Sequence, residues 1–153
     1  MLPSNFNSQA TGVNNPGTVV GFYQNAAGNS SAFEDNAGTI SSFLFPGSIS
    51  TQALGINDLG DIVGDYQTSN GDMFGFLDKG GLFTTLDPFG SIAVTANGIN
   101  DAGDIVGFYL SGDNTIGFEA TSVPEPPPLL LFGTGLAGLV FLAWRRRRPH
   151  EAA

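Results

Sequence analysis

The chain has 153 residues, no cysteine, one histidine and a formal net charge of −9 at neutral pH. The lack of cysteine excludes a disulfide framework, a thiolate metal site and a thiol nucleophile. The only histidine is His150, in the polar C-terminal tail, so the commonest general base and metal ligand is missing from the rest of the chain. This composition predicts no catalytic residue, no cofactor and no enzymatic activity.

Charge is divided unequally along the chain. Twelve of the 14 acidic residues precede Val123, and the only basic residues are Lys79 and Arg145 to Arg148. Binding to a phosphate backbone needs a basic surface, so nucleic acid is not an expected partner. The 22 glycines and 13 phenylalanines instead favour many short strands joined by tight turns.

The first 120 residues contain a repeat. The segments GVNNPGTVVGFY, GINDLGDIVGDY and GINDAGDIVGFY begin 43 residues apart, at Gly12, Gly55 and Gly98. A period in the forties with regular glycines is typical of a repeated all-β unit. We therefore predict a β-repeat region over residues 1–120, with units near 12–54, 55–97 and 98–120.

Each unit contains four short runs with strand character. In the second unit these are TQALGI, DIVGDY, MFGFLD and LFTTLD, with a turn at NDLG between the first two. Asn and Asp close such turns, and Gly60 or Gly103 can take the positive φ that a hairpin demands. Four strands in about 43 residues match one blade of a β-propeller. The predicted fold is all-β, built from repeated four-stranded antiparallel units resembling an incomplete propeller.

This repeat resembles the extracellular HAF family. The family core G-I-N-x-x-G-x-I/V-V-G occurs at Gly55 to Gly64 and at Gly98 to Gly107, and in altered form at Gly12 to Gly21. The aromatic pair of the family survives as Ala32-Phe33. The resemblance implies an exported repeat protein and no established biochemical activity.

The chain opens inside a repeat unit. Met1 to Ser4 align with Leu44 to Gly47, and about two and a half units follow, fewer than the four of the smallest propellers. No basic and apolar leader precedes them. We expect a start codon assigned too late, with upstream DNA continuing in frame to a signal peptide. A truncated sequence and a decayed copy of a longer protein are the alternatives.

The turns of the second and third units are acidic. Their oxygen-bearing side chains are Asn57, Asp58, Asp61, Asp65, Asn100, Asp101 and Asp104. Oxygen ligands at short spacing can hold Ca²⁺, which makes Asp58, Asp61, Asp101 and Asp104 the candidate ligands. The spacing differs from an EF-hand loop, however, and the first turn, NNPGT, has no carboxylate. We therefore favour hairpin geometry over a metal site.

Aromatic residues recur on the predicted strands as Phe22, Tyr23, Tyr66, Phe108 and Tyr109. Their fixed period favours packing in the core or between units. They could also line a surface that binds an extracellular polysaccharide. Burial of all five would favour a structural or adhesive protein, and exposure of a cluster would favour a carbohydrate-binding module or a polysaccharide-acting hydrolase.

The C-terminal segment has a different character. A proline-rich linker over 121–128 contains Val123, Pro124, Glu125 and Pro126, and 16 uncharged residues follow over 129–144. As a helix this run spans about 24 Å, somewhat less than the roughly 30 Å of a bilayer core. We predict a transmembrane helix over 129–144, with Arg145, Arg146, Arg147 and Arg148 stopping transfer and the tail 145–153 in the cytoplasm. A buried helix and a plain anchor are the alternatives.

The order of VPEP, apolar run and arginine cluster closely resembles the PEP-CTERM sorting signal of exported bacterial proteins. The resemblance implies recognition by a membrane-embedded exosortase that cuts near the motif. It further implies an inner-membrane precursor that is delivered to the cell surface or the extracellular space. The expected function is that of a surface or matrix protein with a structural or adhesive role.

Overall fold

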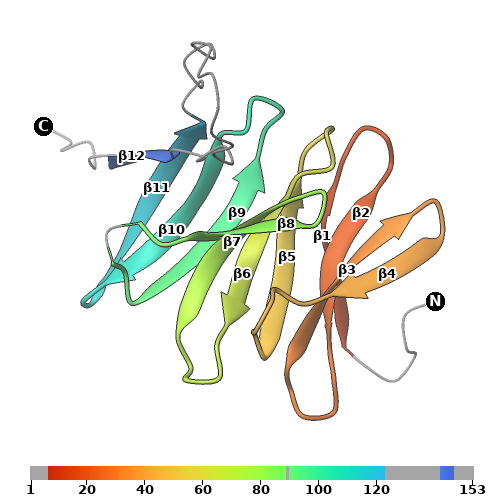
Figure 1. The fold of residues 1–153 in the computed structure, drawn as a ribbon, viewed down its shortest axis with the longest axis horizontal. Helices are drawn as coiled ribbons and strands as arrows, with labels where there is room; N and C mark the ends of the chain where they lie inside the picture. The colour runs from red at the N-terminus through yellow and green to blue at the C-terminus, as the bar shows by residue number, and fades with distance from the viewer. Residues whose placement is uncertain (1–6, 89, 123–141, 147–153) are drawn as a thin grey trace, which may run out of the picture.

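The computed structural model describes residues 7–88, 90–122 and 142–146, and its regular elements are all β-strands (Figure 1). No helix occurs in these ranges, which confirms the all-β prediction for them. The first unit consists of β1 (Ser8–Val13), β2 (Val19–Gln24), β3 (Ser30–Asn36) and β4 (Thr39–Phe43). The second consists of β5 (Ser50–Ile56), β6 (Ile62–Gln67), β7 (Met73–Lys79) and β8 (Leu82–Leu86). The third contains β9 (Ala93–Ile99), β10 (Ile105–Ser111) and β11 (Asn114–Ser122).

Consecutive strands within each unit pair antiparallel. The first unit forms a separate four-stranded sheet in the order β1-β2-β3-β4, as expected. The second and third units share one larger sheet, because a parallel bridge between Met73 of β7 and Ala93 of β9 joins them. The predicted four-stranded antiparallel unit therefore forms a sheet of its own in the first unit, whereas the second and third units merge.

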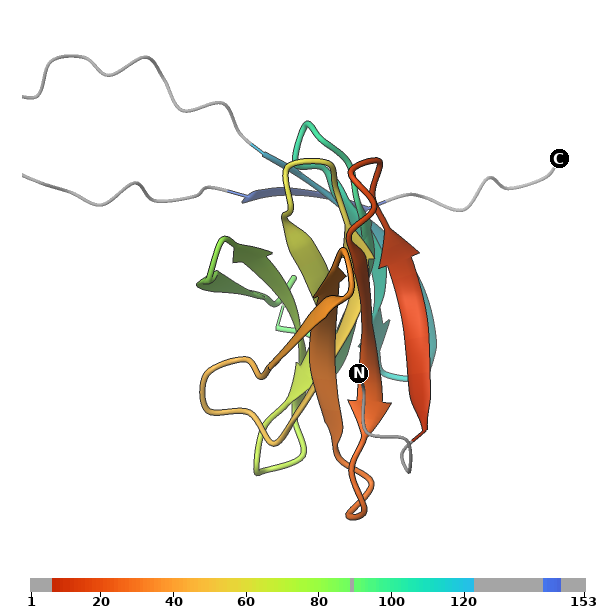
Figure 2. The same cartoon turned by 90° about the vertical axis from the view of Figure 1, so that its right-hand side faces the viewer.

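The units stack by placing the first strand of each one across the unit before it. β5 packs against β1, β2 and β3, and β9 packs against β5, β6 and β7. Figure 1 shows this succession, with β1–β4 at one side and β10 and β11 at the other. Figure 2 views the same strands from the side of β1–β4. Two apolar clusters result, one centred on Val20, Ala53 and Phe76 and the other on Val63, Val94 and Tyr109. A unit therefore completes its core only with a neighbour.

The last glycine of each repeat motif is required by close backbone packing. The first strand of the second unit has a register irregularity between Ala53 and Gly55, and Gly64 of β6 lies opposite it. A Cβ atom on Gly64 would lie 1.9 Å from the carbonyl oxygen of Gln52. At Gly21 and Gly107 the corresponding separations are 2.0 and 2.1 Å. Any larger side chain at these positions would displace the first strand.

The C-terminal segment contributes one further strand, β12 (Leu142–Arg146), which pairs antiparallel with β11. Residues 129–141 of the predicted transmembrane helix lie outside the described residues, whereas 142–144 belong to this strand. β12 occupies the outer position that β4 and β8 hold in their units. It pairs with the backbone N–H and C=O groups along the edge of β11, which would otherwise be open. Within the part of the chain that the structure describes, no helix is long and apolar enough to cross a membrane.

Candidate functional site

The sorting segment begins where the repeat region ends. The last strand of the third unit, β11, ends at Ser122, and the predicted motif Val123 to Pro126 follows at once. These four residues lie outside the described residues, as do Arg147 and Arg148. Arg145 and Arg146 belong to β12, so their predicted role in stopping transfer stays a prediction.

Three equivalent turns, 14–18, 57–61 and 100–104, form what we call the turn ladder. In each turn the backbone N–H of the asparagine donates to the carbonyl oxygen four residues later, at 3.1 Å. The asparagine Oδ1 accepts the N–H of that same residue at 2.8 Å. Gly17, Gly60 and Gly103 have φ values of 91°, 84° and 84°. The predicted roles of Asn and Gly in shaping the turn are confirmed.

Hydrogen bonds also join one turn to the next. Asn14 Nδ2 donates to the carbonyl oxygen of Asn57, and Asn57 Nδ2 donates to that of Asn100, both at 3.0 Å. The N–H of Asn15 donates to Asp58 Oδ1, and the N–H of Asp58 donates to Asp101 Oδ1, both at 2.8 Å. Every bond runs in the same direction, because each turn supplies donors and the following turn supplies acceptors.

These contacts account for the four carboxylates that the sequence suggested as calcium ligands. Asp58 and Asp101 accept backbone N–H groups from the preceding turn. Asp61 Oδ2 accepts from Asn57 Nδ2 and lies 3.4 Å from Lys79 Nζ, while Asp104 Oδ2 accepts from Asn100 Nδ2. Among the described residues no three His, Cys, Asp or Glu side chains are grouped so that they could hold a metal ion. The carboxylates thus serve as structural acceptors in the turns.

Asp65 is separate from the ladder. It lies on β6 and is 6% exposed, and the third unit packs over this strand. Burial raises the pKa of its carboxyl group to about 6, and the side chain of Thr95 opposes this rise. The equivalent positions in the other units are phenylalanines, Phe22 and Phe108. The second unit therefore buries an acid where its neighbours place an aromatic ring.

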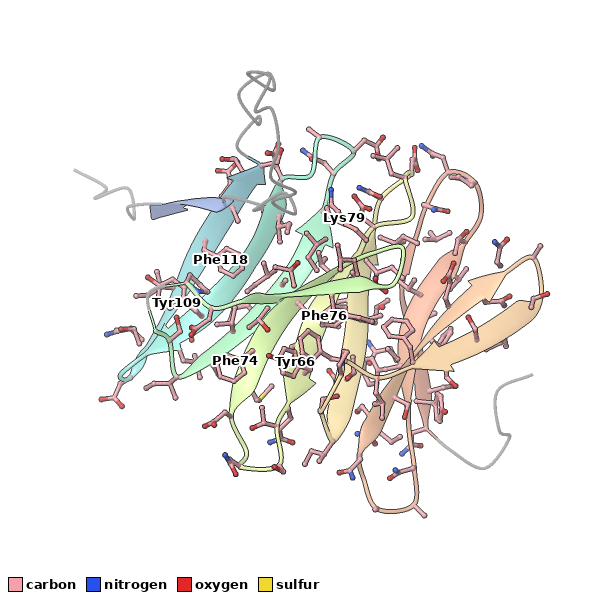
Figure 3. All side chains as sticks on the ribbon, viewed as in Figure 1. Tyr66, Phe74, Phe76, Lys79, Tyr109 and Phe118 are labelled. Carbon is pink, nitrogen blue, oxygen red and sulfur yellow. The ribbon has the colours of Figure 1, made fainter. Side chains whose placement is uncertain are left out.

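The five aromatic residues that the sequence singled out do not form a shared exposed cluster. Tyr66 and Tyr109 are buried, Phe22 and Tyr23 are half-buried, and Phe108 is 38% exposed. Tyr66, Phe74 and Phe76 lie together in the second unit, and Tyr109 and Phe118 lie in the third (Figure 3).

Sequence reasoning missed the ring that completes the aromatic core of the second unit. Phe45 stacks on Tyr66 with ring centroids 3.7 Å apart and planes 2° from parallel. Tyr66 also shares a 2.9 Å hydrogen bond with Thr85. The residue that corresponds to Phe45 in the next unit is Pro88, so the period gives no signal for this ring.

A shallow groove lies where the first and second units meet. It has a volume of about 290 Å³ and is lined by Asn7, Ser8, Gln9, Phe22, Gln24 and Gln52. Amide side chains can donate to and accept from sugar hydroxyls, and an aromatic ring can pack against a sugar face. Of these residues the sequence analysis singled out only Phe22, although Gln9 and Gln52 occupy the same repeat position, 43 residues apart.

A comparison with protein families identifies the C-terminal segment. The family model described as the PEP-CTERM protein-sorting motif matches residues 122–148. No curated protein and no solved structure matches the chain. The matched range contains the VPEP residues, the apolar run and all four arginines, so the predicted sorting motif is confirmed. The match indicates an exported protein that an exosortase sorts, by anchored passage through a membrane, to the cell surface or the extracellular space.

Proposed function

We propose that this chain is a surface or extracellular-matrix protein with a structural or adhesive role. The observation that carries the proposal is the PEP-CTERM match over 122–148, which begins at the last residue of β11. A stacked β-repeat body is thereby joined directly to a sorting signal. We propose that the body consists of HAF-type repeats, because the motif resembling the family core occurs at Gly55 to Gly64 and at Gly98 to Gly107. Its polar turns hold the units together through hydrogen bonds. The proposal includes no enzymatic activity.

In the precursor, residues 129–144 insert as a helix into the bacterial inner membrane. Arg145 to Arg148 hold its end in the cytoplasm, since each arginine costs about 2.5–3.5 kcal/mol at the bilayer centre. Insertion separates residues 142–144 from β11. The prolines of the motif keep residues 123–126 extended and accessible to the exosortase outside the membrane.

Replacement of Pro124-Glu125-Pro126 by three alanines tests this proposal in a bacterial host that has an exosortase. We expect the parent chain to be shortened and released, and the variant to remain at full length in the membrane fraction. Mass spectrometry and fractionation measure both outcomes. Alanine at Pro127 and Pro128 is the matched control, because it removes two prolines but keeps the motif. If the motif variant leaves the membrane as efficiently as the parent, the segment is a plain anchor.

A second candidate function is binding of an extracellular polysaccharide in the groove around Phe22. Its lining combines one ring with glutamine side chains, and the acidic body favours a neutral over an anionic polymer. Affinity electrophoresis in gels containing dextran tests this candidate. Retardation that is lost in Phe22→Ala and kept in Tyr23→Ala supports it, and unchanged mobility of the parent chain excludes this glucan as a ligand.

A further inference from the structure

The third unit exposes a face that the first two units bury. Val20, Val63 and Val106 occupy the same repeat position, but the first two are fully buried and Val106 is 45% exposed. Val63 packs with Val94 and Ala96, which β9 of the next unit supplies. Phe108, on the same strand as Val106, is also exposed, at 38%. No further unit follows to cover these side chains among the described residues.

The first unit exposes the opposite face. Val13 of β1 is 65% exposed, whereas Ile56 at the same position of β5 is 9% exposed. Ala10 is likewise exposed, and its equivalent Ala53 is fully buried. In β5 these positions are covered by the unit that precedes it. Within the described residues, the first and third units therefore expose the two complementary halves of the contact that joins neighbouring units.

Among the described residues, the first and third turns of the ladder each leave hydrogen-bonding groups without a partner, and the two sets are complementary. The carbonyl oxygens of Asn57 and Asn100 each accept one bond within their turn and a second bond from the preceding turn. That of Asn14 accepts only the N–H of Gly17 among the described residues. At the other end, Asn100 Nδ2 donates only to Asp104, and the N–H of Asp101 has no partner within the described ranges. The third turn therefore offers hydrogen-bond donors, and the first turn offers an acceptor.

Charge also permits contact between the two ends. The third turn carries Asp101 and Asp104, whereas the first turn has Asn15 and Thr18 at these positions. No charged residue occurs in β1 or in the first turn. Asn15 directs its Nδ2 to Asp58 Oδ2 at 2.5 Å, so its Oδ1 is available as an acceptor. The repulsion between like charges that opposes self-association of an acidic protein is thus avoided at this contact.

We propose that the third unit of one copy of this chain docks head to tail on the first unit of a second copy. Val106 and Phe108 are then covered by β1 of the second copy, in the way that β9 covers Val63. Asn100 Nδ2 donates to the carbonyl oxygen of Asn14 in the second copy, and the Asp101 N–H donates to Asn15 Oδ1. Such a heterologous contact generates a closed ring or an open filament.

Sedimentation of the full chain in mild nonionic detergent, over about a hundredfold range of concentration, tests this proposal. We expect the parent chain to associate into dimers or longer assemblies, and Val13→Asp and Val106→Asp each to be monomeric. An equimolar mixture of the two variants should form a one-to-one dimer, because Val13→Asp keeps an intact third unit and Val106→Asp keeps an intact first unit. Leu82→Asp is the matched control, since Leu82 is 71% exposed on β8, which pairs with β7 and belongs to neither proposed face. This variant should associate as the parent does.

The remaining outcomes overturn the proposal. A parent chain that is monomeric at every concentration excludes a second copy as the occupant, and leaves repeat units outside this sequence, in the same or another protein, to cover the two faces. Self-association of either single variant places the contact elsewhere, including in the apolar C-terminal segment. A mixture that stays monomeric, while both variants keep the β-sheet circular dichroism of the parent, excludes the head-to-tail geometry. Ala10→Glu and Phe108→Gln form a second pair for the same mixing experiment.

Discussion

Asp65→Asn should stabilise the fold in a way that depends on pH. Burial raises the pKa of this carboxyl group from 3.8 to about 6 in the folded chain, which means that folding disfavours its ionised form. The folded state then binds more protons than the unfolded state between these two values. The stability of the parent chain therefore falls as pH rises from about 4 to about 6 and stays lower above that range. Asparagine has nearly the same shape and carries no charge.

The size of the effect follows from the pKa difference. Each pKa unit corresponds to about 1.4 kcal/mol, so the difference between 3.8 and about 6 amounts to about 3 kcal/mol when Asp65 is fully ionised. We expect the free energy of unfolding of Asp65→Asn to exceed that of the parent by an amount that grows by about 2 kcal/mol between about pH 4.5 and about pH 8. Urea denaturation followed by circular dichroism measures this difference.

A matched control separates burial from the general acidity of the chain. Asp113 is exposed, in the turn between β10 and β11, and Asp113→Asn removes the same charge. Its effect on unfolding should show little dependence on pH. The reasoning is refuted if the stability difference between parent and Asp65→Asn is the same at both ends of the pH range. It is equally refuted if Asp113→Asn reproduces the pH dependence.

Two further substitutions test the packing between strands and between turns. Gly64→Ala should lower the free energy of unfolding by about 3 kcal/mol or more, because its Cβ would meet the Gln52 carbonyl oxygen at 1.9 Å. In Gly117→Ala the nearest atom is 3.8 Å away, so an equal loss in this control would contradict the steric explanation. Asn57→Ala should lower the free energy of unfolding by about 1–2 kcal/mol more than Asn100→Ala does, because Asn57, unlike Asn100, also donates a hydrogen bond to the following turn. Urea denaturation measures both pairs. Equal losses in the two asparagine variants would contradict a stabilising contribution from the hydrogen bonds between turns.

Short stretches of the sequence are enough to specify the turns and strands of the repeat region and to identify the sorting motif. Turns such as 57–61 are recognisable because Asn57 closes the turn through bonds to its own chain neighbours, and Gly60 takes a positive φ regardless of what surrounds it. The strand periods on either side are equally local. The sorting motif is a linear signal, and it was readable without any fold.

The way in which the units meet depends on contacts between distant parts of the chain, which the structure reveals and the sequence does not. It paired Leu142–Arg146 with β11, and it placed Phe45 on Tyr66 although no repeat position marks this ring. The clearest case is the segment DIVG, which is identical at 61–64 and 104–107. Val63 is fully buried and Val106 is 45% exposed. Burial at this position depends on whether another unit packs across the strand, and that contact joins residues too far apart in the sequence for local patterning to specify.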